Sequence, residues 1–194
     1  MKKDIIHLLA LTAILLWSSC CTNKVKPVIE PDKDIETRIE KILSGMTLEE
    51  KVGQMAQITI TVIQNNDKDG NPQWIPSMLD SVITKYKVGS ILNVINEQAQ
   101  TRKLTSDMIK ELQEKSMKEL GIPCLYGLDQ IHGASYIADA TLFPQEINVA
   151  ATFNREHAFN MGEVTAYESR AALNPWSFSP TLDLGRDQRW PRPR

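Results

Sequence analysis

One short apolar run that ends in polar and charged residues constrains the fold of this chain more than any other stretch. It covers residues 122–133 and has the sequence IPCLYGLDQIHG. Gly121 and Pro123 end the helix predicted before it, and the apolar residues that follow have the length of a buried β-strand. Asp129 comes directly after that strand. In sheets built from βα units the carboxyl ends of the strands carry the chemistry, so Asp129 is a candidate site residue. The alternative is a strand followed by a turn, with Asp129 capping the next element.

The order of the elements predicted around this strand is that of an α/β protein. The spacing of apolar residues predicts strands over 54–60, 88–93 and 176–180, and helices over 35–45, 78–86, 105–120 and 154–172. Thr47 and Glu50 have the spacing of a capping box at the start of a further short helix. Thr105 or Ser106 can cap the third helix, and Asn154 the last. Because helices and strands alternate, the sequence predicts an α/β fold with a parallel sheet.

Composition excludes one class of partner. The 194 residues include 22 Lys or Arg and 24 Asp or Glu, which gives a net charge of −2. No basic patch appears along the chain, so we expect no nucleic-acid partner. The length and the 42% hydrophobic share suit one globular domain or part of a larger one.

The cysteines indicate neither a disulfide framework nor a metal site. Cys20 and Cys21 are adjacent near the start, which leaves Cys124 as the one thiol of the predicted folded part. Because Cys124 lies in an apolar strand, we interpret it as a small core residue rather than a nucleophile. No Cys and His residues have zinc spacing, and we expect no metal and no cofactor.

Residues 1–20 have the features of an export signal of the lipoprotein type. Lys2 and Lys3 precede an apolar run over 5–17, which is too short to span a hydrocarbon core of about 30 Å. Two serines then precede Cys20, the residue expected to be lipidated. The alternatives are a plain secretory signal cleaved nearby, or processing at Cys21. Residues 21–34 are predicted to be a tether, and the protein is expected in the periplasm or at the outer membrane, held by a lipid anchor.

Several strings, in order and at sensible spacings, resemble the N-terminal domain of glycoside hydrolase family 3, the group that contains bacterial exported β-glucosidases. They are MTLEEKVGQM at 46–55, GIPCLYGLDQIHG at 121–133, ATLFPQ at 140–145, AATFN at 150–154, EVTAYESRA at 163–171 and WSFSPTLDLGRDQRW at 176–190. The family fold is a (β/α)₈ TIM-type barrel, usually followed by an α/β sandwich domain. The resemblance therefore implies that residues 35–194 are the N-terminal portion of such a barrel, with about half of the strands.

The resemblance also assigns two substrate-binding residues. Asp129 matches the family aspartate that binds hydroxyls of the sugar where the bond is cut. Arg192 matches an arginine of the family string Arg-Asp-Pro-Arg-Trp-Gly-Arg, which also reaches the sugar. This chain has Gln188 for the usual Pro and Pro191 for the usual Gly, and the second change can move the backbone beside Arg192.

Further residues of these strings receive structural interpretations. His132 is expected to support its loop rather than to touch sugar. Trp190 is expected to pack in the wall, with stacking on a sugar as the alternative. Arg186, Asp187 and Arg189 are expected to form ion pairs that hold the strand end.

A retaining glycosidase needs two carboxyl groups about 5 Å apart. In the family both come from later segments, so we expect no catalytic residue within this chain, which we interpret as a fragment. The string DQIHG at 129–133 resembles the β-glucosidase branch and not the N-acetylhexosaminidase branch, which typically has DQEGG. The expected substrate is an oligosaccharide or β-glucoside with a terminal β-linked glucose, and xylose is the nearest competitor. The other hypotheses are a non-catalytic carbohydrate-binding surface lipoprotein and an unrelated α/β surface lipoprotein.

Overall fold

The computed structural model describes residues 30–182, 187 and 189. The predicted signal, the predicted lipidation site Cys20 and most of the predicted tether lie outside these residues. The chain divides into two compact units, residues 1–45 and 46–194.

The described part of the first unit contains one helix, α2 (Lys33–Gly45). The Oδ1 atom of Asp32 accepts hydrogen bonds from the backbone N–H groups of Asp34 and Ile35, which satisfies two donors of the first turn (2.9 and 3.2 Å). Its apolar residues have the predicted helical spacing and remain exposed within the described residues; they are Ile35, Ile39, Ile42 and Leu43.

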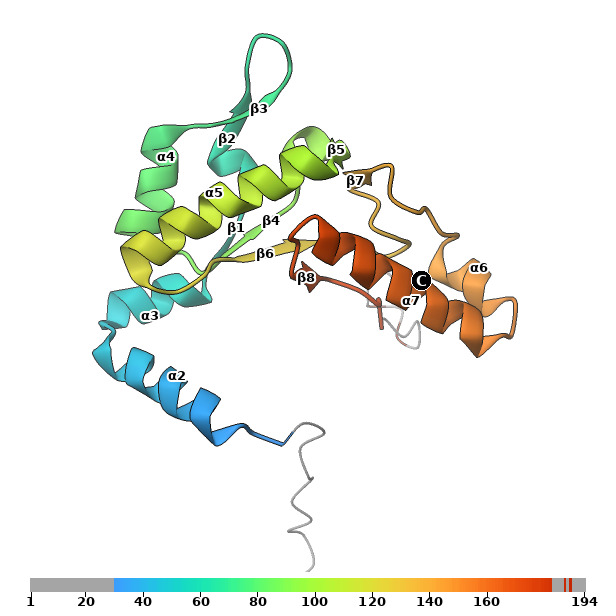
Figure 1. Ribbon diagram of the computed structural model, residues 1–194, viewed down its shortest axis with the longest axis horizontal. Coiled ribbons are helices and arrows are strands. Elements are labelled where there is room, and N and C mark those ends of the chain that lie inside the picture. Colours follow the sequence, from blue (N-terminus) through green and yellow to red (C-terminus); the bar gives the residue numbers. More distant parts are fainter. Residues whose placement is uncertain (1–29, 183–186, 188, 190–194) are drawn as a thin grey trace, which may run out of the picture. The chain divides into compact units, whose positions relative to one another are not determined.

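The second unit is built on a four-stranded parallel sheet (Figure 1). Its strands are β1 (Gln57–Thr59), β4 (Ser90–Leu92), β6 (Leu125–Leu128) and β8 (Trp176–Ser177). They neighbour one another in the order β1-β4-β6-β8, which is their order along the chain. In a doubly wound sheet the order reverses at a switch point, whereas in a βα barrel successive strands lie side by side around the wall. The sheet therefore has the topology of a barrel wall, as predicted.

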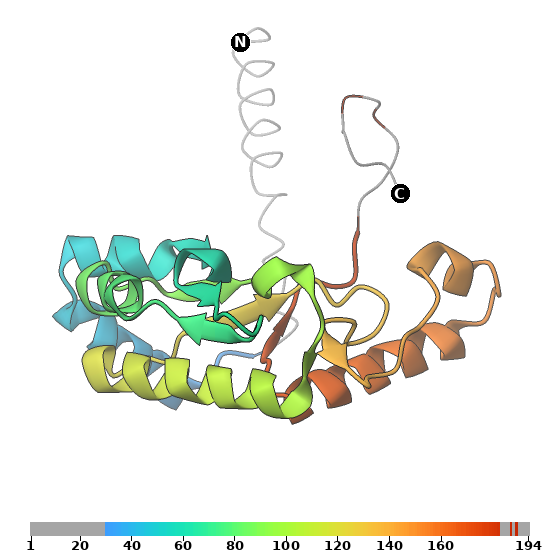
Figure 2. The same cartoon turned by 90° about the horizontal axis from the view of Figure 1, so that it is seen from above.

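Helical segments connect the strands. The segment α4 (Pro76–Asp80) continues into a π-helical turn, η2 (Ser81–Lys85), between β1 and β4. Helix α5 (Arg102–Leu120) leads from β4 to β6, and α7 (Arg155–Ala171) leads from β6 to β8. Figure 2 shows α5 and α7 along the same side of the sheet. Right-handed crossovers between parallel strands place their helices on one face in this way.

Local signals set several helix ends. Helix α3 (Leu48–Met55) begins with the predicted capping box, in which Thr47 Oγ1 accepts from Glu50 N and the Glu50 carboxylate accepts from Thr47 N (3.2 and 3.0 Å). Asn154 caps α7 by accepting from Glu156 N at 3.0 Å. Gly121 ends α5 with a φ of +66°, a conformation that favours glycine.

One predicted cap is wrong. Helix α5 starts before the candidates Thr105 and Ser106, because Thr101 Oγ1 accepts from Leu104 N at 3.3 Å. Thr105 lies inside the helix, and it is only 2% exposed.

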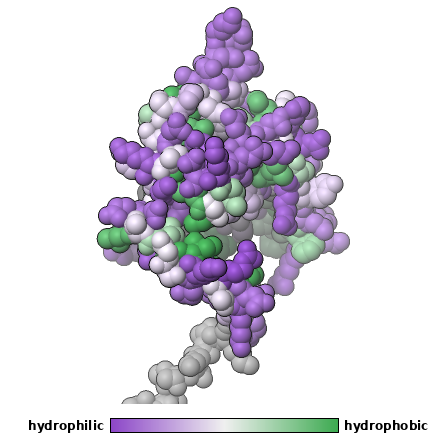
Figure 3. Space-filling view, turned by 60° about the vertical axis from the view of Figure 1, so that its left-hand side comes forward, coloured by the Kyte–Doolittle hydropathy of each residue, from purple (hydrophilic) through white to green (hydrophobic). Residues whose placement is uncertain are grey.

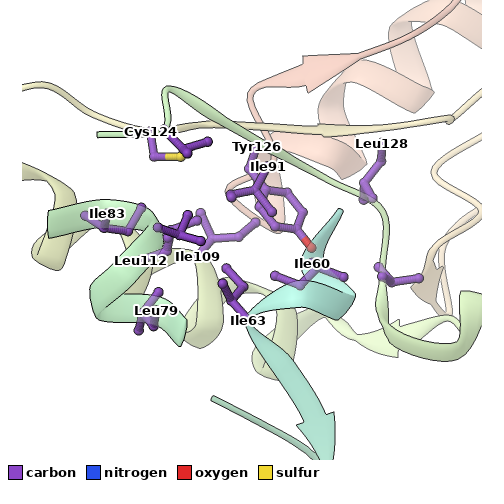
Figure 4. Close-up of a cluster of buried hydrophobic side chains, with 13 residues drawn as sticks. Ile60, Ile63, Leu79, Ile83, Ile91, Ile109, Leu112, Cys124, Tyr126 and Leu128 are labelled. Carbon is purple, nitrogen blue, oxygen red and sulfur yellow. The ribbon is translucent and has the colours of Figure 1, made fainter. Parts of the chain in front are cut away.

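The main core lies between the sheet and its helices (Figure 4). Ile91 from β4 and Tyr126 and Leu128 from β6 pack with Leu79, Ile83, Ile109 and Leu112 from α4, η2 and α5. Cys124 belongs to the same cluster, and burial raises the pKa of its thiol to about 12. A thiol that stays protonated at neutral pH is a poor nucleophile, so Cys124 is a core residue as predicted.

The remaining elements are short. They are η1 (Ile60–Val62), η3 (Ile95–Glu97), α6 (Glu146–Ala150), the antiparallel pair β2 (Gln64–Asn66) and β3 (Pro72–Trp74), and the parallel pair β5 (Gln100–Thr101) and β7 (Ile137–Ala138). Residues 65–72, between the strand predicted over 54–60 and the helix predicted over 78–86, form the tip of the β2–β3 hairpin and parts of both its strands. No helix among the described residues is long and apolar enough to cross a bilayer.

Apolar side chains also reach the surface. Figure 3 draws one face, on which hydrophobic residues lie in groups among hydrophilic ones. Helix α3 contributes exposed apolar residues to the surface of the second unit, with Leu48, Val52 and Met55 between 59% and 87% exposed.

Candidate substrate-binding site

Polar residues gather at the carboxyl edge of the sheet because parallel strands end there together. Thr61 follows β1 within η1, Asn93 follows β4, Asp129 follows β6 and Ser179 follows β8. Asn93 has a φ of +70°, and its backbone joins β6 through two hydrogen bonds, from Asn93 N to Gly127 O (3.3 Å) and from the Tyr126 hydroxyl to Asn93 O (2.6 Å). The residues that follow β4 and β6 are therefore neighbours.

Asp129 is exposed and makes no hydrogen bond or ion pair with any other described residue. The interpretation of Asp129 as a cap of the next element has no support, since its carboxylate accepts no backbone N–H there. An ionised carboxylate has two oxygens and accepts only. Both oxygens are available to hydroxyl donors from outside.

The residue after Asp129 is fixed in the interior. Gln130 is 1% exposed, and its side-chain Oε1 accepts a hydrogen bond from Ser169 Oγ of α7. Its backbone N–H donates to Leu128 O at 3.0 Å. The exposed carboxylate thus sits on a backbone that is anchored one residue further on.

His132 contacts the backbone of its own loop, as expected. Its Nδ1 lies 3.2 Å from the carbonyl oxygen of Phe143, and Phe143 N donates to His132 O at 2.9 Å. Because a carbonyl oxygen only accepts, Nδ1 is the donor in this contact.

Gly133 has a conformation that requires glycine. Its φ is +104°, and a Cβ at this position would lie 2.2 Å from the carbonyl oxygen of Thr141. Bridges of Gly133 to Ile131 and Leu142 bring the two ends of the loop together at the same point. A side chain here would push Thr141 away.

An aromatic pair covers the end of β6 on the face opposite the main core. The rings of Trp176 and Phe178 have centroids 4.9 Å apart at 82°. A Cβ on Gly127 would lie 2.4 Å from the Phe178 ring, so a glycine lets the ring approach the strand. Within the described residues Trp176 stays 38% exposed and Leu125 50%, so this face of the sheet is only partly covered.

A cavity of about 770 Å³ lies on the helix side of the sheet, and its lining does not include Asp129. Its lining includes Gln130 and Ser177, each with a buried atom that has no hydrogen-bond partner, Gln130 Nε2 and Ser177 Oγ. Its walls come mainly from α6 and α7. The structure thus does not join the cavity to the exposed carboxylate.

The second predicted substrate-binding residue, Arg192, lies outside the described residues, as do Trp190, Arg186, Gln188 and Pro191. Asp187 and Arg189 do form an ion pair, with Nη2 2.6 Å from Oδ2, and the hydrogen bonds of Arg189 lower the pKa of Asp187. Both side chains are more than half exposed and belong to one short segment. A local, solvated pair contributes little to holding a strand.

Two residues around the segment that follows β6 were not predicted from the sequence as part of the site. Asn93 ends a predicted strand, a position that could have marked it, as it marked Asp129. Glu168 lies within the helix predicted over 154–172, and its carboxylate accepts two hydrogen bonds from Thr141, 27 residues away. Nothing local in the sequence signals a contact at that separation.

The fold and the residues at the carboxyl edge of the sheet together define a class of protein. Parallel strands in chain order, helices along one side and an unpaired carboxylate at the carboxyl edge are the features of a βα-barrel wall that carries its site at the strand ends. The model of the glycosyl hydrolase family 3 N-terminal domain matches residues 47–194. The chain belongs to glycoside hydrolase family 3.

Relatives with known names include β-glucosidases and β-xylosidases. The chain is 33% identical to a lysosomal β-glucosidase of Dictyostelium discoideum over 81% of its length, and 28% identical to a periplasmic β-glucosidase of Salmonella typhimurium over 79%. It is 29% identical to a putative β-xylosidase of Formosa agariphila over 99%. The aligned regions span 20%, 17% and 25% of these three relatives.

Solved structures agree with the fold. An exo-1,3/1,4-β-glucanase from a Pseudoalteromonas species superposes with a TM-score of 0.66 at 30% identity, over 84% of this chain and 25% of that one. A β-glucosidase from Listeria innocua, solved in complex with glucose, superposes with a TM-score of 0.55 at 30% identity, over 81% and 20%.

Proposed function

We propose that this chain is the N-terminal part of an exported glycosidase that releases terminal β-linked glucose in carbohydrate catabolism. The observation that carries the proposal is Asp129, an exposed carboxylate with no partner among the described residues, at the carboxyl end of β6 in a family 3 barrel wall. In this role Asp129 binds hydroxyls of the terminal sugar. An ionised carboxylate accepts charge-assisted hydrogen bonds from two hydroxyls at once.

Arg192 is the second proposed sugar contact. A guanidinium donates two hydrogen bonds in a fixed planar geometry and stays charged at any physiological pH. Support for this role comes from the match of Arg192 to an arginine of the family string. The same string departs from the family pattern at Gln188 and Pro191.

Hydrolysis with retention needs a nucleophilic carboxylate and an acid/base carboxylic acid about 5 Å apart. Among the described residues that directly follow the four strands, Asp129 is the only carboxylate. The proposal therefore assigns both catalytic groups to segments that the longer relatives have and this chain does not cover. The half-covered face around Trp176 and Leu125 would then pack against the rest of the barrel.

Glucose is preferred over xylose as the terminal sugar because residues 129–133, DQIHG, resemble the β-glucosidase branch. Names of the relatives include both activities, so a β-xylosidase is the second candidate. The test is a panel of aryl β-glycosides, assayed on the protein that the whole reading frame containing this chain encodes. The glucoside should be cleaved fastest. Faster cleavage of the xyloside would favour a β-xylosidase instead. Faster cleavage of the N-acetylglucosaminide would refute both candidates.

The proposed location is the periplasm or the outer membrane, through a lipid on Cys20. Support comes from the signal-like residues 1–20 and from the relative named as periplasmic. One acyl chain binds a membrane only marginally, so stable anchoring takes the several chains of a lipoprotein. Cys20→Ala should move the protein from the membrane to the soluble fraction. If Cys21→Ala does so and Cys20→Ala does not, the lipidated residue is Cys21.

A further inference from the structure

Two adjacent residues of α7 reach opposite ends of the segment that begins at Asp129. Glu168 contacts Thr141 near the end of this segment, and Ser169 contacts Gln130 at its start. For residues 129–143 we use the name Asp129 loop. The loop has little regular structure of its own, so contacts from outside decide its conformation.

The contact of Glu168 is bidentate. Its Oε2 accepts from the backbone N–H of Thr141 and its Oε1 accepts from the Thr141 hydroxyl, each at 2.9 Å. A carboxylate that receives two donors from one residue fixes that residue in both position and orientation.

The contact of Ser169 is buried. Ser169 is 5% exposed and Gln130 is 1% exposed, so neither side chain can exchange this bond for one with water. Ser169 Oγ also lies 2.5 Å from the carbonyl oxygen of Thr165, one turn earlier in α7. The start of the loop is therefore tied to the helix backbone.

Inside the loop the two ends are joined to each other. Gly133 is bridged to Leu142, and His132 and Phe143 exchange backbone and side-chain contacts. A displacement of Thr141 would therefore pass to Gly133 and His132, which lie close to Asp129 in the chain.

We propose that Glu168 and Ser169 are positioning residues that hold the Asp129 loop at both ends and thereby set the Asp129 carboxylate for sugar. The inference rests on the proposed function for its purpose, since Asp129 must bind sugar for its placement to matter. The statement that Glu168 and Ser169 hold the loop rests on their contacts alone.

The experiment uses matched variants of the protein that the whole reading frame containing this chain encodes. Thr141→Val removes the hydroxyl with little change in shape, and Thr141→Ser restores it. Glu168→Gln removes the charge, and Glu163→Gln is its control, because the exposed side chain of Glu163 on the same helix makes no hydrogen bond or ion pair with any described residue. Asp129→Asn reports on the proposed function.

Two quantities are measured for each variant. Hydrogen exchange of the amides of residues 129–143 reports how firmly the loop is held, and an NMR titration with methyl β-glucoside gives the dissociation constant. Thr141→Val and Glu168→Gln should each raise loop exchange about 3- to 10-fold and weaken glucoside binding by a similar factor. Thr141→Ser and Glu163→Gln should match the parent chain.

Unchanged loop exchange in both Thr141→Val and Glu168→Gln would overturn the inference. The inference would also be overturned if loop exchange became faster while glucoside binding stayed unchanged, provided that Asp129→Asn does weaken binding. The contacts would then hold the loop without determining the position of the Asp129 carboxylate. If Asp129→Asn leaves glucoside binding unchanged, the proposed function fails instead, and loop exchange in the Thr141 and Glu168 variants alone decides whether Glu168 holds the loop.

Discussion

At the scale of single residues, the Asp129 loop depends on a glycine for two separable reasons. Gly133 has a left-handed φ of +104°, and a Cβ there would lie 2.2 Å from Thr141 O. Gly70 also has a left-handed φ, +85°, but a Cβ there would meet nothing within 4 Å. Comparing the two separates the backbone conformation from the steric contact.

Gly133→Ala should therefore destabilise the chain by more than Gly70→Ala does. The backbone alone costs about 1–2 kcal/mol in each variant. Gly133→Ala adds displacement of Thr141, which we expect to raise the total to about 3 kcal/mol or more. Urea denaturation of both variants measures the difference. Equal losses of stability would show that Thr141 moves aside at no cost.

Some of the candidate side chains could be interpreted from the sequence, and others could not. Asp129, His132 and Cys124 could be interpreted because each stands in or beside one recognisable strand. The bond from Glu168 to Thr141 could not, because it joins residues that only the packing of α7 brings together. Arg192 and Cys20 stay predictions, since both lie outside the described residues.

At the scale of elements, three helix ends were predictable, whereas the start of α5 and the bounds of some strands were not. Thr47, Gly121 and Asn154 each carry a local signal that the structure confirms. The strand predicted over 54–60 is shorter, Gln57–Thr59, because α3 continues to Met55. The pair β2 and β3 is built from residues such as Gln64 and Asn65 that give no alternating apolar pattern.

The capping box of α3 gives a prediction at this scale. Thr47→Ala removes the acceptor for Glu50 N, so it should lower the free energy of unfolding by about 1 kcal/mol. Thr47→Ser keeps the hydroxyl and should stay close to the parent chain. Thermal or urea unfolding measures both variants, and a loss with Ser equal to that with Ala would mean that the hydroxyl does not stabilise the helix.

At the scale of the whole molecule, the second unit has the wall of a barrel and one half-covered sheet face. The family and the strand order were predictable from motifs that recur at sensible spacings. The large cavity beside α7 was not, since no sequence pattern marks it. Its lining combines α6, α7 and the residues around β8.

The 194-residue chain alone should not hydrolyse glycosides. The proposed function assigns both catalytic carboxyl groups to segments that this chain does not cover, and hydrolysis with retention needs both of them. Losing one member of a cooperating catalytic set already costs several orders of magnitude in rate. Release of phenol from an aryl β-glucoside measures this directly. Turnover by the chain that is lost in Asp129→Asn would require a catalytic carboxylate within it, and Asp183, Asp187 and Glu168 would be the candidates.

The central claim is that Asp129 binds the terminal sugar, and its most direct test is kcat/KM for an aryl β-glucoside in the protein encoded by the whole reading frame. Asp129→Asn should lower kcat/KM by about 100-fold or more, because hydrogen bonds to a charged acceptor each contribute about 1.5–3 kcal/mol. The melting temperature should stay unchanged, since Asp129 has no partner among the described residues. Asp139→Asn, an exposed carboxylate of the same loop, is the control and should leave kcat/KM unchanged. Equal values of kcat/KM for Asp129→Asn and the parent enzyme would contradict the claim.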